Sequence, residues 1–494
     1  MAFAATDLPQ LGKAFWTEAT FKRRVGPRYA LLPLRFLRLD TDRYICTSFA
    51  GEYVVLSTAN LHSLVRHSLA PDAAIYNELK SKHFLMDGDS NVALDLLACK
   101  YRTKHSLLAQ LTSLFLFVVT LRCEHSCPYC QVSRQSQDRQ AYDMQRDDAE
   151  RAIDFVFASP AQTVKIEFQG GEPLLNFDLV RWIVNRVHER NTVKNISFVI
   201  ATNLALLTTE VLDFCRERDI LISTSLDGPR ELHNANRPRP GNDSFERTVT
   251  AIATVRESLG NDHIAALMTT TKASLSQPEA IIDEYVRQGF SSIFLRSLSP
   301  FGFAVKTGAI GSYTVDEWLA FYKRALAYIL RLNQEGTPFR EEYAALLLRK
   351  MLTPFPTGYV DLQSPAGMGI SCLAFNYDGS IYASDEARML AEMRDDTFCL
   401  GHLATDSFEA VISSDKLIDV LSQTLTESVP MCADCGIQPY CGSDPVYHYA
   451  TQGDPVGMKP MSGFCHKNME IVRLLIRLLE DDDCAGGILR SWAA

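Results

Sequence analysis

Two groups of cysteines carry the residue types best suited to chemistry in this chain of 494 residues, which contains 13 cysteines. The first group is Cys123, Cys127 and Cys130, with three and then two residues between them. Thiolates are soft ligands that suit iron–sulfur clusters and zinc. A zinc site would need a fourth ligand, for which His125 is a candidate. A four-iron cluster held by three thiolates keeps one iron open instead, and we expect a redox-active cluster of this kind.

The second group is a set of four cysteines near the C-terminus, Cys432, Cys435, Cys441 and Cys465. Four thiolates form a closed ligand set with no open position, and both zinc and a four-iron cluster fit it. Cys372 lies upstream and is a further candidate ligand. Because a reducing compartment disfavours disulfides, clustered cysteines indicate metal ligands there.

Polar residues follow several apolar segments between the two groups. Gly170 and Gly171 precede Glu172 in the phrase Gly-Gly-Glu-Pro. Adjacent glycines let a backbone approach a ligand closely, and a carboxylate can bind an ammonium group. Asn203 and Ser225 end two later segments, where they either contact a ligand or cap a turn. No carboxylate or histidine stands out as a general base.

These residues lie at the ends of a repeating pattern of apolar strands and amphipathic helices. The predicted strands are residues 114–120, 164–168, 196–201, 220–226, 263–270 and 292–297, and the predicted helices are 147–157, 178–188, 210–218, 245–258, 279–288 and 314–332. Six such repeats predict an α/β fold with a parallel sheet, a partial (β/α)6 TIM-type barrel. Chemistry in such barrels gathers at the carboxyl ends of the strands.

The chain divides into four regions by pattern. We expect an N-terminal α+β domain in residues 1–105, with strands at 44–47 and 53–56 and helices after residue 57 and at 73–80. The barrel occupies residues 106–335 and a linker 336–363. Residues 364–494 form a Cys-rich domain that ends in a helix, a composition that suits a small fold stabilised by metal.

Composition excludes some function classes. The formal net charge of −10 argues against a general nucleic-acid binder, which needs a basic face. The apolar run at 114–121 is far too short to span a bilayer. Residues 1–10 show no basic segment followed by an apolar core, so no signal peptide is visible. We therefore expect a cytoplasmic protein with no nucleic-acid or membrane partner.

The first cysteine group, with Tyr129 before its last cysteine, resembles the signature of the radical S-adenosylmethionine (SAM) superfamily. The resemblance implies a [4Fe-4S] cluster whose open iron chelates SAM, and hydrogen abstraction by a 5′-deoxyadenosyl radical. The residues that it implies as cofactor contacts are Tyr129 near the adenine, Gly170, Gly171 and Glu172 at the methionine amine, Asn203 and Ser225 at the ribose and carboxylate, and Arg237.

The second cysteine group resembles the auxiliary-cluster (SPASM) domain of radical SAM peptide maturases. The resemblance implies at least one auxiliary [4Fe-4S] cluster, held by the four cysteines of that group. For a second auxiliary cluster the chain departs from the family pattern, because Ser384 and Asp444 stand where cysteines are usual, while Cys372 is in place. We favour the absence of that cluster over an atypical ligand set of Cys372 and Asp444.

Longer phrases resemble the radical SAM maturases of His-Xaa-Ser peptide-modification systems. They are residues 31–36, 51–53, 130–135, 384–390 and 441–449, and the resemblance extends from about residue 29 to 465. It implies a ribosomally made precursor peptide, a side-chain crosslink, and a reductant such as flavodoxin or ferredoxin.

Within this resemblance the N-terminal domain has two interpretations. It is a candidate peptide-recognition module that adds a peptide strand to a sheet edge, or it only caps the barrel. Three other functions stay open: a sulfatase-type maturase that forms formylglycine, a non-catalytic iron–sulfur electron-transfer protein, and a zinc-stabilised interaction protein.

Overall fold

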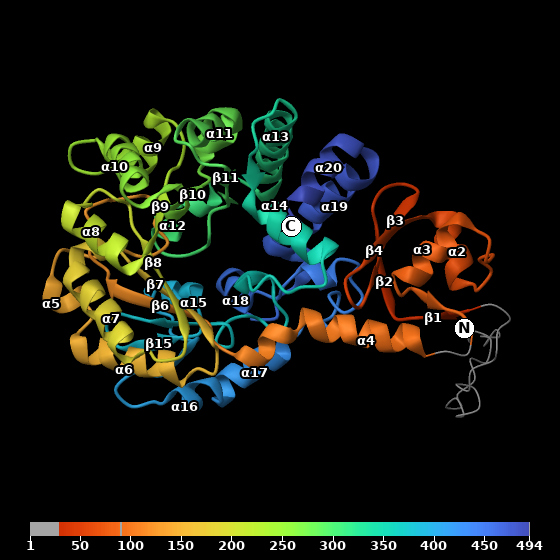
Figure 1. Ribbon diagram of the computed structural model, residues 1–494, viewed down its shortest axis with the longest axis horizontal. Coiled ribbons are helices and arrows are strands. Elements are labelled where there is room, and N and C mark those ends of the chain that lie inside the picture. The colour runs from red at the N-terminus through yellow and green to blue at the C-terminus, as the bar shows by residue number, and fades with distance from the viewer. Residues whose placement is uncertain (1–28, 89–90, 494) are drawn as a thin grey trace, which may run out of the picture.

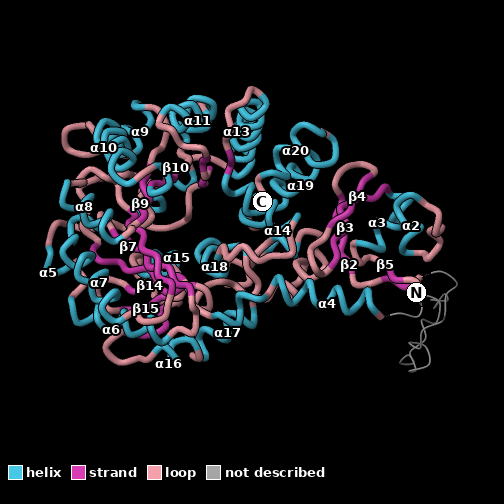
Figure 2. The backbone as a smooth tube through the Cα atoms, in the orientation of Figure 1, coloured by secondary structure: helices cyan, strands magenta, loops and turns pink. Residues whose placement is uncertain are grey.

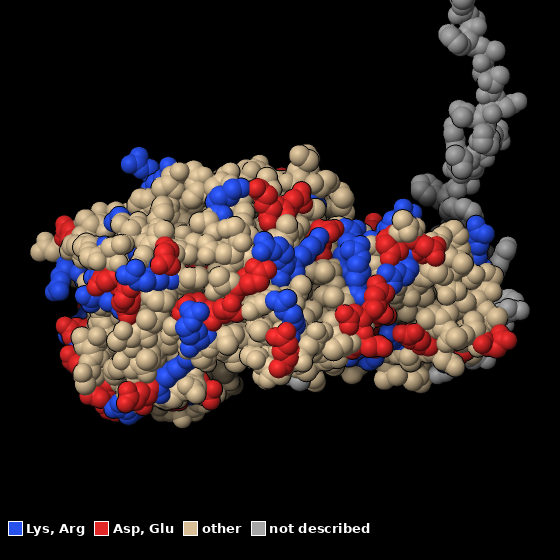
Figure 3. Space-filling model, turned by 90° about the horizontal axis from the view of Figure 1, so that it is seen from above, with Lys and Arg blue, Asp and Glu red and all other residues tan. Residues whose placement is uncertain are grey.

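The computed structural model describes residues 29–88 and 91–493. The barrel lies at one end of the long axis and the N-terminal domain at the other, with much of the C-terminal region between and beneath them (Figure 1). On the face shown in Figure 3, acidic and basic side chains are interspersed. No helix among the described residues is long and apolar enough to cross a membrane. Residues 1–10, on which the expectation about a signal peptide rests, lie outside the described residues.

Six parallel strands form the barrel, as the sequence predicts (Figure 2). They are β6 (Leu114–Thr120), β7 (Thr163–Gly170), β8 (Asn195–Ala201), β9 (Leu221–Ser225), β10 (Ile264–Thr269) and β12 (Leu295–Arg296). The helices that cover them are α6 (Arg146–Ala158), α7 (Phe177–Arg190), α8 (Thr209–Arg218), α10 (Ser244–Leu259), α11 (Pro278–Arg287) and α13 (Val315–Gln334). The short helices α5 (Arg139–Tyr142), α9 (Arg230–Asn236) and α12 (Phe303–Lys306) lie in the loops.

The barrel strands are buried on both faces, which explains why their sequences are continuous apolar runs. In β6, Phe115, Phe117 and Val119 pack against the helices in one core cluster, whereas Leu116 belongs to another. A parallel strand covered on both sides needs apolar residues at consecutive positions, so the run 114–120 shows no alternation.

The last predicted strand, 292–297, is divided in the structure. Its first half, β11 (Ser292–Ile293), pairs with β13 (Arg340–Glu341), and its second half, β12, pairs with β10. The carboxylate of Glu341 is fully buried and accepts a hydrogen bond from the backbone N–H of Leu295 at 3.1 Å. This side chain replaces a strand partner at the point where the chain changes sheets.

The C-terminal region continues the barrel sheet. β14 (Cys372–Phe375) pairs in parallel with β6, and β15 (Ser380–Tyr382) and β16 (Cys399–His402) follow in antiparallel order. Within the described residues the sheet has nine strands in the order β12-β10-β9-β8-β7-β6-β14-β15-β16. The helices of this region are α15 (Asp385–Ala391), α16 (Phe408–Ile412), α17 (Asp415–Gln423), α18 (Pro445–Gln452), α19 (Gly463–Asp481) and α20 (Asp483–Ser491).

The N-terminal domain contains a three-stranded antiparallel sheet of β2 (Leu34–Arg38), β3 (Arg43–Ser48) and β4 (Tyr53–Ser57). Its other elements are α2 (Thr58–Val65), α3 (Ala74–Ser81), the strand pair β1 (Ala30–Leu31) and β5 (Leu85–Met86), and the long α4 (Val92–Lys104). The hydroxyl of Ser57 caps α2 by accepting a hydrogen bond from Asn60 N. The domain packs against the C-terminal region, where the Tyr440 hydroxyl donates to the Gly51 carbonyl at 2.9 Å.

The region between the barrel and the Cys-rich domain, residues 336–363, contains a helix, α14 (Glu342–Leu352). Its buried face includes Leu347, Leu348 and Met351, which join the core cluster that α13 and α19 also supply. This helix therefore packs the barrel and the C-terminal region together.

Candidate functional site

The loop after β6 carries the first cysteine group, and a buried ion pair anchors it. Arg122 is 3% exposed and donates to the Asp143 carboxylate from Nε at 2.7 Å and from Nη2 at 2.8 Å. The same guanidinium donates to the Leu175 carbonyl, and the Thr120 hydroxyl also binds Asp143 at 2.6 Å. The backbone that leads into Cys123 is therefore fixed before the ligand loop begins.

The thiols of this loop lie in surroundings that oppose a free negative charge. Burial raises the pKa of Cys127 to about 12 and raises that of Cys123. A buried thiol of this kind ionises when it binds a metal centre. The donor set therefore fits an iron–sulfur cluster better than a set of free reactive thiols.

Gly170 and Gly171 pack against the backbone of this loop. A Cβ atom at Gly170 would lie 1.9 Å from the Thr120 carbonyl oxygen, and one at Gly171 would lie 2.2 Å from that of Arg122. The N–H of Gly171 donates to the Thr120 carbonyl at 2.8 Å, and that of Glu172 donates to the Arg122 carbonyl at 2.7 Å. The two glycines thus allow the loop after β7 to touch the cysteine loop, a role that the sequence alone did not indicate.

Glu172 is completely buried at the end of this loop and connects two strands. Its carboxylate accepts hydrogen bonds from Leu174 N at 3.0 Å, from the Thr202 hydroxyl at 2.6 Å and from Asn203 N at 2.8 Å. Burial, and then the nearby Glu124 carboxylate, raises the pKa of Glu172 to about 8. Two buried carboxylates close together favour a cation between or beside them.

Glu124 supplies an unsatisfied acceptor at the same place. Its Oε1 pairs with His125 Nδ1 at 3.0 Å, whereas its buried Oε2 has no hydrogen-bond partner among the residues that the structure describes. Its carboxylate, the Cys123 thiol and the His125 ring have ligand atoms within 4.8 Å of one another. A ligand with an ammonium group next to the cluster would satisfy this oxygen, so the site fits the methionine amine of SAM.

His125 is not a free ligand, because both of its ring nitrogens are already used. Nδ1 contacts Glu124, and Nε2 lies 2.8 Å from the Ser244 hydroxyl, with the ring 3% exposed. The zinc interpretation of the first group therefore loses its fourth ligand.

Asn203 and Ser225 lie at the same end of the sheet. Asn203 Nδ2 is 4.0 Å from Cys123 Sγ, and its Oδ1 accepts from Ala205 N at 2.8 Å. Hydrogen bonds to cluster sulfurs tune iron–sulfur centres, so Asn203 is placed to do this. Ser225 is partly exposed at the end of β9, in register with Leu267 of β10.

Tyr129 and Arg237 meet at Asp227, a residue that the sequence analysis did not select. The Tyr129 hydroxyl donates to Asp227 Oδ2 at 2.5 Å, Arg237 Nε donates to the same oxygen at 3.1 Å, and the guanidinium lies 5.5 Å from the Tyr129 ring centre. Asp227 is fully buried and follows β9 by two residues. The signal that could have found it was a carboxylate directly after a predicted strand, and its function here is to hold the cysteine loop against β9.

The second cysteine group also comes together in space. The Cys441 thiol, whose pKa burial raises to about 12, lies within electrostatic reach of Cys465, Cys435 and Cys432. Lys459 is 6% exposed and lies near three of these thiols. Four thiols within electrostatic reach of one another or of a buried cation fit an anionic metal centre.

Cys372 lies elsewhere, in the middle of the sheet. It is 2% exposed in β14, and its thiol donates to the Ala383 carbonyl at 3.6 Å. Ser384 and Asp444, the two positions where a cysteine is usual, are helix caps: Ser384 Oγ accepts from Ala387 N at the start of α15, and Asp444 Oδ1 from Tyr447 N at the start of α18. Their use as caps favours the absence of a second auxiliary cluster.

A cavity with about 660 Å³ of empty space lies near both cysteine groups, and two of its lining residues, Tyr343 and Lys467, are within electrostatic reach of Cys441. One wall is the segment 297–301 after β12, which leads directly to Phe303, whose N–H donates to the Cys130 carbonyl at 2.7 Å. Residues of the opposite wall, among them Tyr447 and Phe464, lie in sequence between Cys441 and Cys465. A molecule in this cavity would therefore lie close to both metal-ligand sets.

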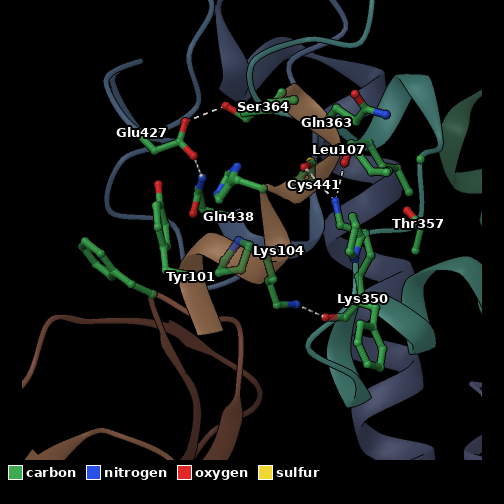
Figure 4. Close-up of a pocket in the computed structure, with 18 residues that line it drawn as sticks. Tyr101, Lys104, Leu107, Lys350, Thr357, Gln363, Ser364, Glu427, Gln438 and Cys441 are labelled. Carbon is green, nitrogen blue, oxygen red and sulfur yellow. Dashed lines mark hydrogen bonds between the residues drawn. The ribbon is translucent and has the colours of Figure 1, made fainter. Parts of the chain in front are cut away.

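A second pocket, with about 710 Å³ of empty space, is lined by Cys441 together with residues of α4 and α14 (Figure 4). Lys350 donates from Nζ to the Leu362 carbonyl and, at 3.5 Å, to that of Cys441, and Lys104 donates to the Lys350 carbonyl at 2.5 Å. Burial lowers the pKa of Lys350 to about 7 and of Lys104 to about 8. Glu427 faces the pocket and accepts from Gln438 Nε2 at 3.0 Å.

Comparison with known proteins identifies the class of the barrel. Residues 117–291 match the family model described as the Radical SAM superfamily, so the chain contains a radical SAM domain. Such a domain implies a [4Fe-4S] cluster that binds SAM.

Relatives extend the comparison beyond this domain. An uncharacterized protein of Methanocaldococcus jannaschii is 30% identical over 183 residues, which are 37% of this chain and 61% of that protein, so less than two thirds of its length is covered. The cysteine-type anaerobic sulfatase-maturating enzyme of Clostridium novyi is 23% identical over 329 residues, 65% of this chain and 83% of that enzyme. The radical SAM cyclopropyl synthase TigE of Paramaledivibacter caminithermalis is 26% identical over 161 residues, 30% of this chain and 33% of that enzyme.

Solved structures show that the fold is that of radical SAM maturases. Native anSMEcpe with bound AdoMet and Cp18Cys peptide superposes with a TM-score of 0.61 at 18% identity, over 76% of this chain and 99% of that chain. Streptococcus suis SuiB bound to precursor peptide SuiA gives a TM-score of 0.52 at 13% identity, over 87% of this chain and 98% of that chain. The Cys-rich C-terminal region is compatible with a SPASM domain in this fold.

Proposed function

We propose that this protein is a radical SAM peptide maturase, which removes hydrogen from a side-chain carbon of a ribosomally made precursor peptide and forms a side-chain crosslink. The observation that carries the proposal is the cavity near the two cysteine groups. The segment that forms its wall after β12 continues to Phe303, which is hydrogen-bonded to the Cys130 carbonyl, and Tyr447 and Phe464 of its opposite wall lie between Cys441 and Cys465 in the sequence. This position suits a substrate that reacts at one metal centre and gives up an electron near another.

The two cysteine groups would hold the cofactors. Cys123, Cys127 and Cys130 would hold a four-iron cluster which, with SAM bound, supplies the 5′-deoxyadenosyl radical chemistry. Cys432, Cys435, Cys441 and Cys465 would hold an auxiliary cluster that supplies an electron acceptor. Glu172 and Glu124 would bind the methionine amine, and Asn203, Ser225, Tyr129 and Arg237 would line or stabilise the same site.

The protein's own residues orient the peptide and exclude water. Seven of the sixteen residues that line the cavity are aromatic, and these rings help to shield a reactive carbon radical from solvent. Crosslinking removes two hydrogens from the peptide: one as an atom, the other as a proton and an electron. The reductant is a small electron carrier such as flavodoxin or ferredoxin, and the site of action is the cytoplasm, where cysteines stay reduced.

The N-terminal domain is a candidate for binding the leader part of the peptide. One edge of its sheet is already in contact with the second cysteine group, because Phe36 of β2 forms a bridge with Cys435. The opposite edge, β4, pairs only with β3 among the described residues, and it could receive an extended peptide by strand addition.

The test is a reductant-dependent assay for 5′-deoxyadenosine with anaerobically reconstituted protein. We expect turnover that Cys123→Ala abolishes and that Cys99→Ala, at an exposed cysteine outside both groups, leaves intact. Co-expression with a small peptide encoded beside the protein should then give a mass loss of two hydrogens within one short motif, for which a His-Xaa-Ser sequence is the expected place. Protein with a normal iron content that forms no 5′-deoxyadenosine would exclude the proposal in favour of an electron carrier.

Sulfatase-type maturation is the second candidate. It is favoured by similarity to the sulfatase-maturating enzyme of Clostridium novyi, which the chain matches over 83% of that enzyme's length. The mass spectrum separates the two, because oxidation of a cysteine or serine side chain to an aldehyde localises to one residue and a crosslink joins two. An aldehyde that reacts with a hydrazide reagent would move the assignment to this second function.

A further inference from the structure

The cavity near the two cysteine groups adjoins two smaller hollows. It shares Ser297, Leu298 and Trp318 with a neighbouring space of about 630 Å³, and it shares Asp361, Glu386 and Asp444 with another of about 260 Å³. The three spaces therefore lie next to one another between the barrel and the C-terminal region, and we treat them as one channel. We call it the central channel.

Aromatic rings supply most of the wall near its middle. They come from the end of the barrel, from α14 and the segment after it, and from α18 and α19; they are Phe294, Trp318, Tyr343, Tyr359, Tyr447 and Phe464. Large flat rings accept both apolar groups and cations, the latter through the negative face of the ring. The wall therefore suits a side chain with an apolar stem and a positive end.

The central channel is lined by more acidic than basic side chains. Three carboxylates line it, Asp361, Glu386 and Asp444, against two cations, Arg296 and Lys467. If all five are ionised, the sum is one negative charge (3 − 2). Among these five groups, the ion pair in the described residues joins Arg296 Nη2 and Glu386 Oε1 at 3.9 Å, which is a loose contact.

Burial and neighbouring carboxylates both raise the pKa of carboxyl groups in the channel. Burial, and then Asp361 and Asp385, raises the pKa of Glu386 to about 7. Burial, and then Asp361 and Glu386, also raises that of Asp444. Asp385 adds little to the excess, because its carboxylate is paired with Arg388 at 2.8 Å. One further cation in the channel would lower both pKa values and balance the charge.

The amine of Lys467 is a second polar group in the channel that a ligand could contact. Its amine lies 5.8 Å from the Trp318 ring centre and 5.6 Å from that of Tyr343, and no hydrogen bond or ion pair joins it to another residue in the described part of the chain. These ring contacts, and a third with Phe464 at 5.8 Å, leave the N–H donors of the amine available for an acceptor. A peptide carbonyl oxygen would supply one, while the carboxylates bind a positive side chain.

We propose that the central channel binds a basic residue of the precursor peptide, with its positive side chain at Asp361, Glu386 and Asp444 and a backbone carbonyl at Lys467. This inference rests on the proposed function in one respect, that the substrate is a peptide. It adds the chemical class of residue that the peptide presents beside the first cysteine group.

Binding of small blocked amino acids to the full-length protein, without reductant, tests this inference. The probes are the N-acetyl amides of arginine, lysine and histidine, and that of norleucine as the uncharged control. Trp318 lines the channel, so its fluorescence should report binding, and Trp318→Phe should remove the signal. We expect at least one basic probe to bind at least tenfold more tightly than the norleucine probe.

Charge-removing variants locate the binding. Glu386→Gln and Asp361→Asn should each weaken the basic probes at least tenfold, whereas Glu409→Gln, at an exposed position on α16, should not change their affinity. Circular dichroism of each variant shows whether it is folded, and two variants keep the test decisive if one is not.

Three results would overturn the inference: equal binding of the norleucine probe, no binding of any probe, or tight binding of Mn²⁺ alone that displaces the basic probes, which would make the cluster a metal site. The outcome is independent of turnover. Basic probes that bind to protein that forms no 5′-deoxyadenosine would support the channel and contradict the proposed function. Active protein that binds no probe would support the proposed function and contradict the inference about the channel.

Discussion

Gly171→Ala tests whether close contact between two loops holds the first cysteine group in place. The new Cβ would lie 2.2 Å from the Arg122 carbonyl oxygen and 2.6 Å from that of Leu121, so the loops must separate by about 1.2 Å to reach the 3.4 Å of ordinary contact. That movement breaks the hydrogen bonds from Gly171 N to Thr120 and from Glu172 N to Arg122. With roughly 1 kcal/mol for each bond and 1–3 kcal/mol for overpacking, the loop loses about 3–5 kcal/mol.

The assay is amide hydrogen exchange over residues 120–130, read by mass spectrometry, with iron counted after anaerobic reconstitution. A loss of about 3 kcal/mol corresponds to at least roughly a hundredfold faster exchange in this loop. The variant should also lose the iron of the first group and keep that of the second. Gly311→Ala is the matched control, because its Cβ would meet nothing within 4 Å. Unchanged exchange and a full iron content in Gly171→Ala would refute the reasoning.

Three further predictions concern other parts of the site. Arg237→Met should cost roughly 3–5 kcal/mol of stability, because it leaves the buried Asp227 carboxylate without its cation. A double variant that adds Asp227→Asn should recover most of this stability in urea unfolding. A double variant as unstable as Arg237→Met would contradict the pairing. Burial lowers the pKa of His233 to about 3, and an unfolded histidine titrates near 6.5. The stability tied to its neutral form is therefore present above about pH 6.5 and lost as pH falls from there towards 3, by about 1.4 kcal/mol per unit. His233→Gln should show a flatter dependence between pH 7 and 5, and identical slopes would speak against it. Cys465→Ala should remove about four irons per chain, whereas Cys484→Ala, at an exposed cysteine, should remove none; zinc at the second group would instead leave the iron count unchanged.

The barrel could be predicted from sequence because its signals are local. Apolar runs such as 114–120 and amphipathic segments such as 245–258 coincide with β6 and α10 to within one residue at each end. The division of the last strand could not be seen in this way. It depends on Glu341, which lies 46 residues beyond Leu295 and reaches it only in the folded chain.

The site was predictable to the extent that motifs name residue types, and less so where contacts decide their role. The sequence predicts that the backbone at Gly170 and Gly171 lies close to a ligand. In the structure, the backbone of these two residues instead packs against the cysteine loop. Two other features arise from packing between the ends of separate strands: the Glu124 oxygen without a hydrogen-bond partner, and the shared contact of Tyr129 and Arg237 with Asp227. The spacing of residues in the sequence does not predict either of them. For the same reason, the use of Ser384 and Asp444 as helix caps appears only once α15 and α18 are placed.

The pairing of β14 with β6 makes the barrel and the C-terminal region unsuited to exchange as separate modules. The strand that delivers the first three thiols is the immediate neighbour of a strand from the region that holds the other four. A barrel that ended before residue 364 would present the hydrogen-bonding edge of β6 to solvent, where another chain could pair with it. Insertions that lengthen the loops leave the pairing of β14 with β6 intact. An unrelated domain in place of the C-terminal region would have to supply a new strand to cover the edge of β6.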